Sequence, residues 1–92
     1  MRVTILGPNL TAAAQRRGDM HVHAAGCADI RQYGRGRRYG GEDRGWTIEA
    51  DSRRAVIEAI YPPDEFDYDP ETELDGFASD VYFAPCVELG EA

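Results

Sequence analysis

The sequence predicts an α+β fold in a single domain, residues 1–92, with a small antiparallel or mixed sheet of about four strands and one main helix, residues 52–61, packed on it. Four short stretches alternate apolar and polar side chains, which is the pattern of half-buried strands. One stretch has apolar residues at helical spacing and is followed by Pro62 and Pro63. A chain of 92 residues buries only about 60 to 65% of its unfolded surface, so we expect a thin core.

The first strand is predicted at residues 2–6, RVTIL, and the second at residues 19–25, DMHVHAA. In the second strand, Met20, Val22 and Ala24 share one face and the two histidines share the other. We expect these two strands to pair with each other. The connection between them, NLTAAAQRRG, is either one or two helical turns or a long hairpin loop.

A third strand is predicted at GWTIEA, where Trp46 and the alternate residues after it are expected to point inward. The helix follows at once, with Asp51 or Ser52 as its N-cap. The last strand is predicted in DVYFAPCVEL, residues 80–89. Pro85 favours an edge position or a bulge for this strand, because proline cannot donate a backbone hydrogen bond.

Charge is divided unevenly along the chain. Residues 1–41 hold seven arginines against two aspartates, whereas residues 42–92 hold three arginines against fifteen acids, which gives the net charge of −7. The basic residues gather in a Gly/Arg loop at 31–45, and the acidic residues in a second loop at 62–80. Such an uneven charge distribution indicates which partners a protein attracts or repels, and says nothing about its fold.

The stretch HVHAAGC places two imidazoles and a thiol close together, and FAPC supplies a second thiol. His21, His23, Cys27 and Cys86 would give zinc the four nitrogen and sulfur ligands of a structural site. The spacing lacks the C-x-x-C knuckle of such sites, however. The sequence therefore favours a protein without a cofactor, in which the histidines occupy the wetter face of the strand and the cysteines are small buried hydrophobes. Zinc is the alternative.

The sequence gives little indication of catalysis. A nucleophilic Cys27 with His21 or His23 as its base would need a third orienting group and an oxyanion hole, and the residue types alone define neither. We therefore expect a non-enzymatic protein. The short apolar start MRVTILGPNL does not fit a signal peptide or a membrane span, and two cysteines do not suggest a secreted disulfide framework. These features predict a cytoplasmic protein without a membrane partner.

The basic loop RQYGRGRRYGG resembles the arginine-glycine segments that contact RNA. Arg35, Arg37 and Arg38 would meet phosphates, and Tyr33 and Tyr39 would stack on bases. The acidity of the whole chain opposes the approach of nucleic acid. The favoured interpretation is a loop whose arginines pair with the chain's own carboxylates, and nucleic-acid binding is the alternative.

The acidic loop interleaves carboxylates with aromatic residues. Carboxylates at this density imitate a row of phosphates and suit a basic groove on another protein, while aromatic side chains supply anchors. The predicted contact residues are Asp64, Glu65, Phe66, Asp67, Tyr68, Asp69, Glu71 and Phe77. The alternative is a solvated loop that keeps a small protein soluble.

At HVHAAGCADI, GWTIEADS and VYFAPCV the chain resembles a loose group of small uncharacterised proteins encoded by actinobacteriophages, especially mycobacteriophages. The chain has no lysine and a single asparagine, which agrees with strongly GC-biased coding. The resemblance implies a phage accessory protein that works in the cytoplasm of its host and binds host machinery. It brings no catalytic or ligand residue with it.

Overall fold

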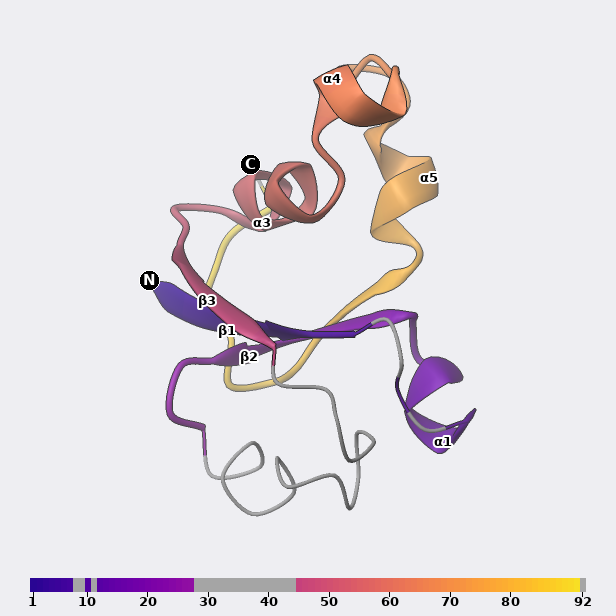
Figure 1. The fold of residues 1–92 in the computed structure, drawn as a ribbon. Coiled ribbons are helices and arrows are strands. Elements are labelled where there is room, and N and C mark those ends of the chain that lie inside the picture. Colours follow the sequence, from indigo (N-terminus) through magenta and orange to yellow (C-terminus); the bar gives the residue numbers. More distant parts are fainter. Residues whose placement is uncertain (8–9, 11, 28–44, 92) are drawn as a thin grey trace.

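The computed structural model describes residues 1–7, 10, 12–27 and 45–91. The described residues form a mixed sheet of four strands with helix α3 across one face (Figure 1), which confirms the predicted α+β fold. The strands are β1 Arg2–Leu6, β2 Met20–Ala24, β3 Trp46–Glu49 and β4 Val81–Phe83. The helices are α1 Ala12–Gln15, α3 Arg53–Ile60, α4 Pro63–Phe66 and α5 Leu74–Ala78.

The strands lie in the order β3-β1-β2-β4. The central strand β1 pairs antiparallel with β2, as predicted, and with β3 on its other side. By contrast, β2 pairs parallel with β4, where Met20 lies opposite Val81. Because parallel strands run in the same direction, the C-terminal ends of β2 and β4 lie on the same side of the sheet.

The last strand is shorter than the sequence predicts. It occupies an edge of the sheet, as Pro85 indicates, but it ends at Phe83 instead of continuing to residue 89. The Ala84 N–H still donates to the Val22 carbonyl at 2.9 Å, and the chain then turns through Pro85 and Cys86. Proline ends the pairing because it lacks the N–H that the ladder needs.

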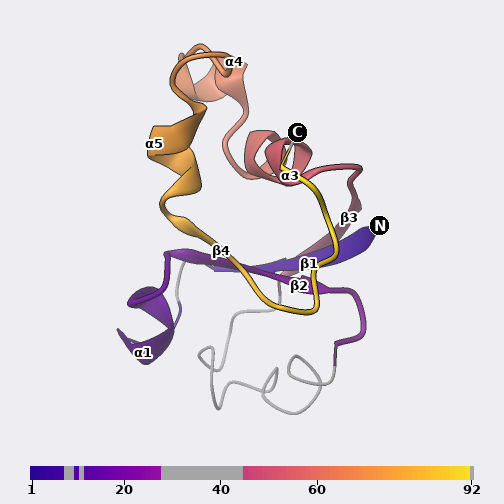
Figure 2. The ribbon, with the colours of Figure 1, turned by 180° about the vertical axis from the view of Figure 1, so that it is seen from behind.

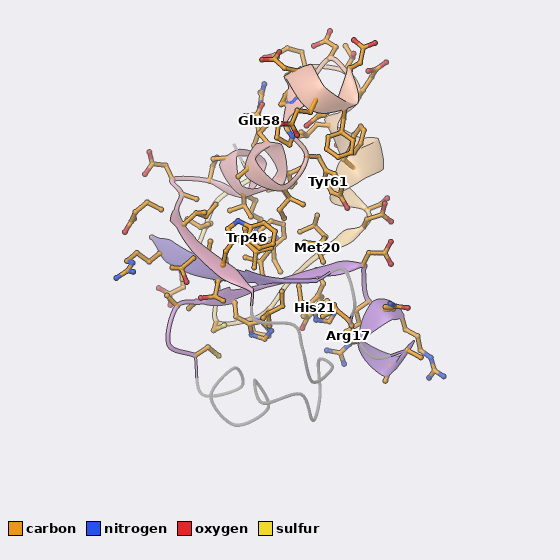
Figure 3. The ribbon with its side chains drawn as sticks, viewed as in Figure 1. Arg17, Met20, His21, Trp46, Glu58 and Tyr61 are labelled. Carbon is orange, nitrogen blue, oxygen red and sulfur yellow. The ribbon has the colours of Figure 1, made fainter. Side chains whose placement is uncertain are left out.

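The main core lies between the sheet and α3. Val3, Ile5 and Val22 on the two central strands are fully buried, and they pack with Val56 and Ile57 of the helix. This is the face that alternation of apolar residues predicts for the sheet. Figure 3 shows the alternation directly, since Met20 and His21 point to opposite sides of the sheet.

Ser52, one of the two predicted N-caps, caps helix α3. The Ser52 Oγ atom accepts a hydrogen bond from the Ala55 N–H at 3.1 Å. The N–H groups of Arg53 and Arg54 donate to the carbonyls of Gly90 and Glu91, at 2.7 and 3.1 Å. The C-terminal segment thus satisfies first-turn N–H groups that a helix cannot satisfy internally.

Trp46 is more exposed than the sequence predicts. It lies opposite Ile5 in the ladder and therefore on the α3 face of the sheet (Figure 3), but 42% of its surface is exposed. Its strand β3 forms an edge of the sheet, and the eight residues of α3 span only about 12 Å. The helix is too short to cover the whole face.

The opposite face of the sheet carries a second, smaller core of Leu6, Leu10 and Ala14. His21 and His23 lie on this face and are 3% and 2% exposed, so the expectation of a wetter face is wrong. The sequence suggested a choice between a loop and helical turns before β2. The structure forms α1 there, on the side of the sheet away from α3 (Figures 1 and 2), and this helix covers part of the face.

The segment 62–80, predicted as an acidic loop, also contains helical structure. It contains the short helices α4 and α5, joined by a turn in which Asp67 adopts a left-handed conformation with φ of 51°. Apart from Gly45, the predicted basic loop at 31–45 lies outside the described residues. No helix among the residues described is both long enough and apolar enough to span a bilayer.

Candidate functional site

Three of the four candidate metal ligands lie together beside the C-terminal ends of β2 and β4. His23 is the second-to-last residue of β2. Cys27 follows β2 through a turn at Ala25 and Gly26, and its N–H donates to the Ala24 carbonyl at 3.0 Å. Cys86 follows β4 through the turn at Pro85. The parallel pairing of the two strands therefore brings the two turns to one place.

We call His23, Cys27 and Cys86 the thiol–imidazole cluster. The His23 Nδ1 atom lies 3.8 Å from the Cys86 Sγ atom, and the ligand atoms of all three residues lie within 4.8 Å of one another. His23 is buried, whereas both cysteines are half-buried rather than enclosed in the core as the sequence suggests. The imidazole of the cluster is thus fixed inside the fold, and its two thiols are partly accessible to solvent.

His21 does not join this cluster. Its Nε2 atom lies 2.7 Å from the Ala14 carbonyl oxygen, and its ring lies 4.8 Å from the ring of Tyr82 on β4. Residues two apart on a strand are separated by about 6.5 to 7 Å, so neighbouring histidines on one face meet different surroundings. His21 packs beside α1, and His23 faces the two turns.

The environment of Cys86 favours the neutral thiol. Burial raises the pKa of Cys86, the thiol of Cys27 beside it raises the pKa further, and a hydrogen bond from the Ala24 N–H to Sγ, 3.2 Å long, opposes the rise. A thiolate here needs a positive partner to replace the solvation that it loses on burial.

The second candidate feature is the acidic arm, which we define as residues 62–80. In Figure 2 its helix α4 lies beyond α3 on the side away from the sheet, and α5 leads back to β4. The arm is attached by Arg54 of α3, whose Nη2 atom lies 2.8 Å from a carboxylate oxygen of Glu71. It is also attached by the Tyr68 hydroxyl, which donates to the Tyr61 carbonyl at 2.6 Å.

Aromatic rings hold the arm together from within. Tyr68 and Phe77 stack with centroids 4.2 Å apart, and Tyr61 contacts Phe66 and Phe77 at 5.3 and 5.2 Å. Phe66, Tyr68 and Phe77 are all predicted from the sequence to anchor a partner. In the structure Tyr68 is buried and Phe77 is half-buried in this packing, whereas Phe66 is 47% exposed. Tyr61, the C-cap residue of α3, also belongs to this ring packing, which no local pattern in the sequence indicates.

The predicted acidic contacts of the arm are all on its surface. The exposed carboxylates among them are Asp64, Glu65, Asp67, Asp69 and Glu71. Two of these already have internal roles, because Asp69 accepts a hydrogen bond from the Glu71 N–H at 2.9 Å and Glu71 pairs with Arg54. Asp64 and Glu65 lie in the first turn of α4, where negative charge is favourable to the helix.

A cavity of about 310 Å³ opens where the arm meets α3 and β4. Its lining includes Arg53 and Arg54 but also Asp75 and Glu91. The Arg53 Nε atom donates to the Leu89 carbonyl at 3.2 Å, and Arg54 is paired with Glu58 and Glu71. The lining carries two positive and two negative side chains, so the cavity presents no field of one sign to a ligand.

The predicted nucleic-acid contacts Tyr33, Arg35, Arg37, Arg38 and Tyr39 lie outside the described residues. Comparison with known proteins identifies no relative, since no family model, no curated protein and no solved structure matches the chain. The thiol–imidazole cluster and the acidic arm are therefore the features that indicate a function.

Proposed function

We propose that this chain is a small non-enzymatic binding protein whose acidic arm docks in a basic groove of a host protein. One observation carries the proposal: Phe66 is 47% exposed on a helix whose neighbouring side chains, Asp64, Glu65 and Asp67, are exposed carboxylates. An exposed aromatic ring within a charged surface suits a partner that offers a pocket surrounded by basic groups.

The attachment of the arm supports this role. The hydrogen bond from Tyr68 to the Tyr61 carbonyl fixes the arm to the end of α3, and the ring stack of Tyr68 and Phe77 orders the arm internally. A surface that is already ordered loses less conformational entropy when it binds than a free loop does. The internal packing of two aromatic residues therefore favours binding by the third, Phe66.

The charge of the arm indicates the class of partner. No basic residue follows Arg54 in the sequence, whereas eleven acids do, so most carboxylates of the arm have no cation near them in sequence. A row of carboxylates resembles a row of phosphates, and a nucleic-acid-binding protein is the kind of partner that such a row fits. The resemblance to actinobacteriophage proteins favours a partner from the host cell.

The experiment is affinity capture from an actinobacterial lysate at low salt, with and without added DNA. We expect a captured nucleic-acid-binding protein that DNA releases, because DNA and the arm would compete for one groove. Phe66→Ser and the double variant Asp64→Lys/Glu65→Lys should lose the capture. The two carboxylates are exposed, and Phe66 is 47% exposed although its ring also contacts Tyr61, so circular dichroism must show that each variant stays folded.

The matched control is Asp51→Lys/Glu88→Lys, which changes net charge equally at two exposed acids outside the arm. It should retain the captured protein. Equal capture by the arm variants would contradict the proposal. Direct binding of the purified chain to DNA at physiological salt would instead favour the arginine loop, because the arm itself repels nucleic acid.

A further inference from the structure

We propose that the thiol–imidazole cluster is a zinc site, in which His23 binds through Nδ1 and Cys27 and Cys86 bind as thiolates. The residues come from two turns and one strand, and the pairing of β2 with β4 gathers them. This site is separate from the acidic arm, and its test does not depend on the identity of any partner.

The spacing of the ligand atoms is within about 1 Å of that around a tetrahedral zinc ion. With Zn–S distances of about 2.3 Å and Zn–N distances of about 2.0 to 2.1 Å, neighbouring ligands lie about 3.6 Å apart for nitrogen and sulfur and about 3.8 Å apart for two sulfurs. The Nδ1 atom of His23 lies 3.8 Å from Sγ of Cys86, and all three ligand atoms lie within 4.8 Å. A closer approach of the ligand atoms by up to about 1 Å would complete the geometry.

The donor set selects the metal. Two sulfurs and an imidazole nitrogen are soft or borderline ligands that suit zinc, whereas calcium and magnesium require oxygen. Among the residues that the structure describes, no further histidine, cysteine or carboxylate joins the group. Three protein ligands leave one coordination position on the metal for water or another ligand, and the half-exposed sulfurs make that position reachable.

One backbone donor would help to stabilise a metal-bound thiolate at Cys86. The Ala24 N–H donates to Cys86 Sγ at 3.2 Å, and backbone donors of this kind orient and stabilise metal-bound sulfur. His23 is held within β2, which pairs on both sides, so its ring needs little reordering to meet a metal. A bound ion would join the turn after β2 to the turn after β4 and so hold the edge strand β4 in place.

The test uses the full chain, reduced with a phosphine to keep both cysteines as thiols and stripped of metal with a chelator. Titration with Co²⁺ should bind about one equivalent and produce thiolate-to-cobalt charge-transfer absorption in the near ultraviolet, which Zn²⁺ then displaces. Zn²⁺ should also raise the melting temperature, since a ligand of the folded state stabilises it.

The first variant is Cys27→Ser, because Cys27 lies half-exposed in a turn and its replacement leaves the core intact. It should weaken Co²⁺ binding, reduce the charge-transfer band and abolish the rise in melting temperature with Zn²⁺. His23→Gln should do the same, whereas His21→Gln, on the same strand face but outside the cluster, should keep the band in its folded fraction. A folded, reduced wild-type chain without the charge-transfer band would overturn the proposal, and so would an unchanged band in Cys27→Ser.

Discussion

The imidazole of His23 and the thiol of Cys86 lie 3.8 Å apart, Nδ1 to Sγ, although 63 positions separate the residues in the sequence. The contact exists because β4 lies parallel to β2 and the chain turns immediately after both strands. The reactivity of these two side chains should therefore change if the edge strand β4 detaches from the sheet.

The reactivity of Cys86 should reveal its burial. Because burial raises the pKa of this thiol, the folded chain holds less thiolate than an ordinary cysteine near pH 8, and the thiolate is the form that reacts. In a Cys27→Ser variant kept free of metal, alkylation by iodoacetamide should be several-fold slower in the folded state than in urea. Mass spectrometry measures the two rates, and equal rates would show that Cys86 is not shielded in solution.

Tyr68→Phe should weaken the attachment of the acidic arm. It removes the hydrogen bond of 2.6 Å from the Tyr68 hydroxyl to the Tyr61 carbonyl. The free energy of unfolding at neutral pH should fall by about 1 kcal/mol. Urea denaturation measures the change, and a variant as stable as the wild type would mean that the hydrogen bond contributes nothing net.

The same variant should alter the alkaline limb of stability. Burial, with a smaller contribution from Glu58, raises the pKa of Tyr68 above its ordinary value of 10.0, so the folded state keeps a proton that the unfolded chain loses. The resulting stability is complete below pH 10.0 and is lost as the pH rises through the higher pKa of the folded state. Between the unfolded and the folded pKa, Tyr68→Phe should lose less stability per pH unit than the wild type, as measured by denaturation from about pH 9 upward.

Ser52→Ala should destabilise the main helix. The variant removes the oxygen that accepts from the Ala55 N–H at 3.1 Å, and loss of an N-cap costs about 1 kcal/mol. The control is Ser79→Ala, which removes an exposed hydroxyl that donates to the Gly76 carbonyl and should change stability by less than about 0.5 kcal/mol. Equal effects at the two positions would contradict a specific role for the cap.

Two glycine-to-alanine variants should have opposite effects. Gly45, which leads into β3, has φ of +63°, and an added Cβ atom would lie 2.5 Å from the Ile5 carbonyl oxygen. Gly45→Ala should lower stability by about 2 kcal/mol. Gly76 lies inside α5 with open space around it, so Gly76→Ala should raise stability by up to about 1 kcal/mol. Thermal or urea denaturation of both variants checks the two signs together.

Local patterns in the sequence predict most of the sheet and the main helix. Residues 2–6 and 19–25 alternate in polarity, and β1 and β2 form there. Residues 52–61 begin with a capping serine and end before two prolines, and α3 follows these limits within one residue. The length of β4 was not predictable in this way, because its pairing with β2 depends on a contact between distant segments.

The candidate site was likewise predictable only in part: its residue types follow from the sequence, but their arrangement depends on contacts between distant segments. The sequence offers four candidate metal ligands, but it does not distinguish His21 from His23, since both lie on one strand face. The choice depends on which end of β2 the turn after β4 reaches, and the parallel register places Cys86 beside His23. Likewise, alternating acids and aromatics predict an unusual surface, but tertiary packing turns Tyr68 inward and leaves Phe66 exposed.

The late position of residues 81–91 in the chain has a consequence for the kinetics of folding. This segment supplies β4, Cys86 and the two carbonyls that receive hydrogen bonds from the start of α3. During synthesis β1, β2, β3 and α3 all leave the ribosome before it, and pairing of Met20 with Val81 then closes a long loop, which is a slow step. Until that step the outer edge of β2 has unpaired backbone groups, and an open strand edge is where nascent chains associate with one another.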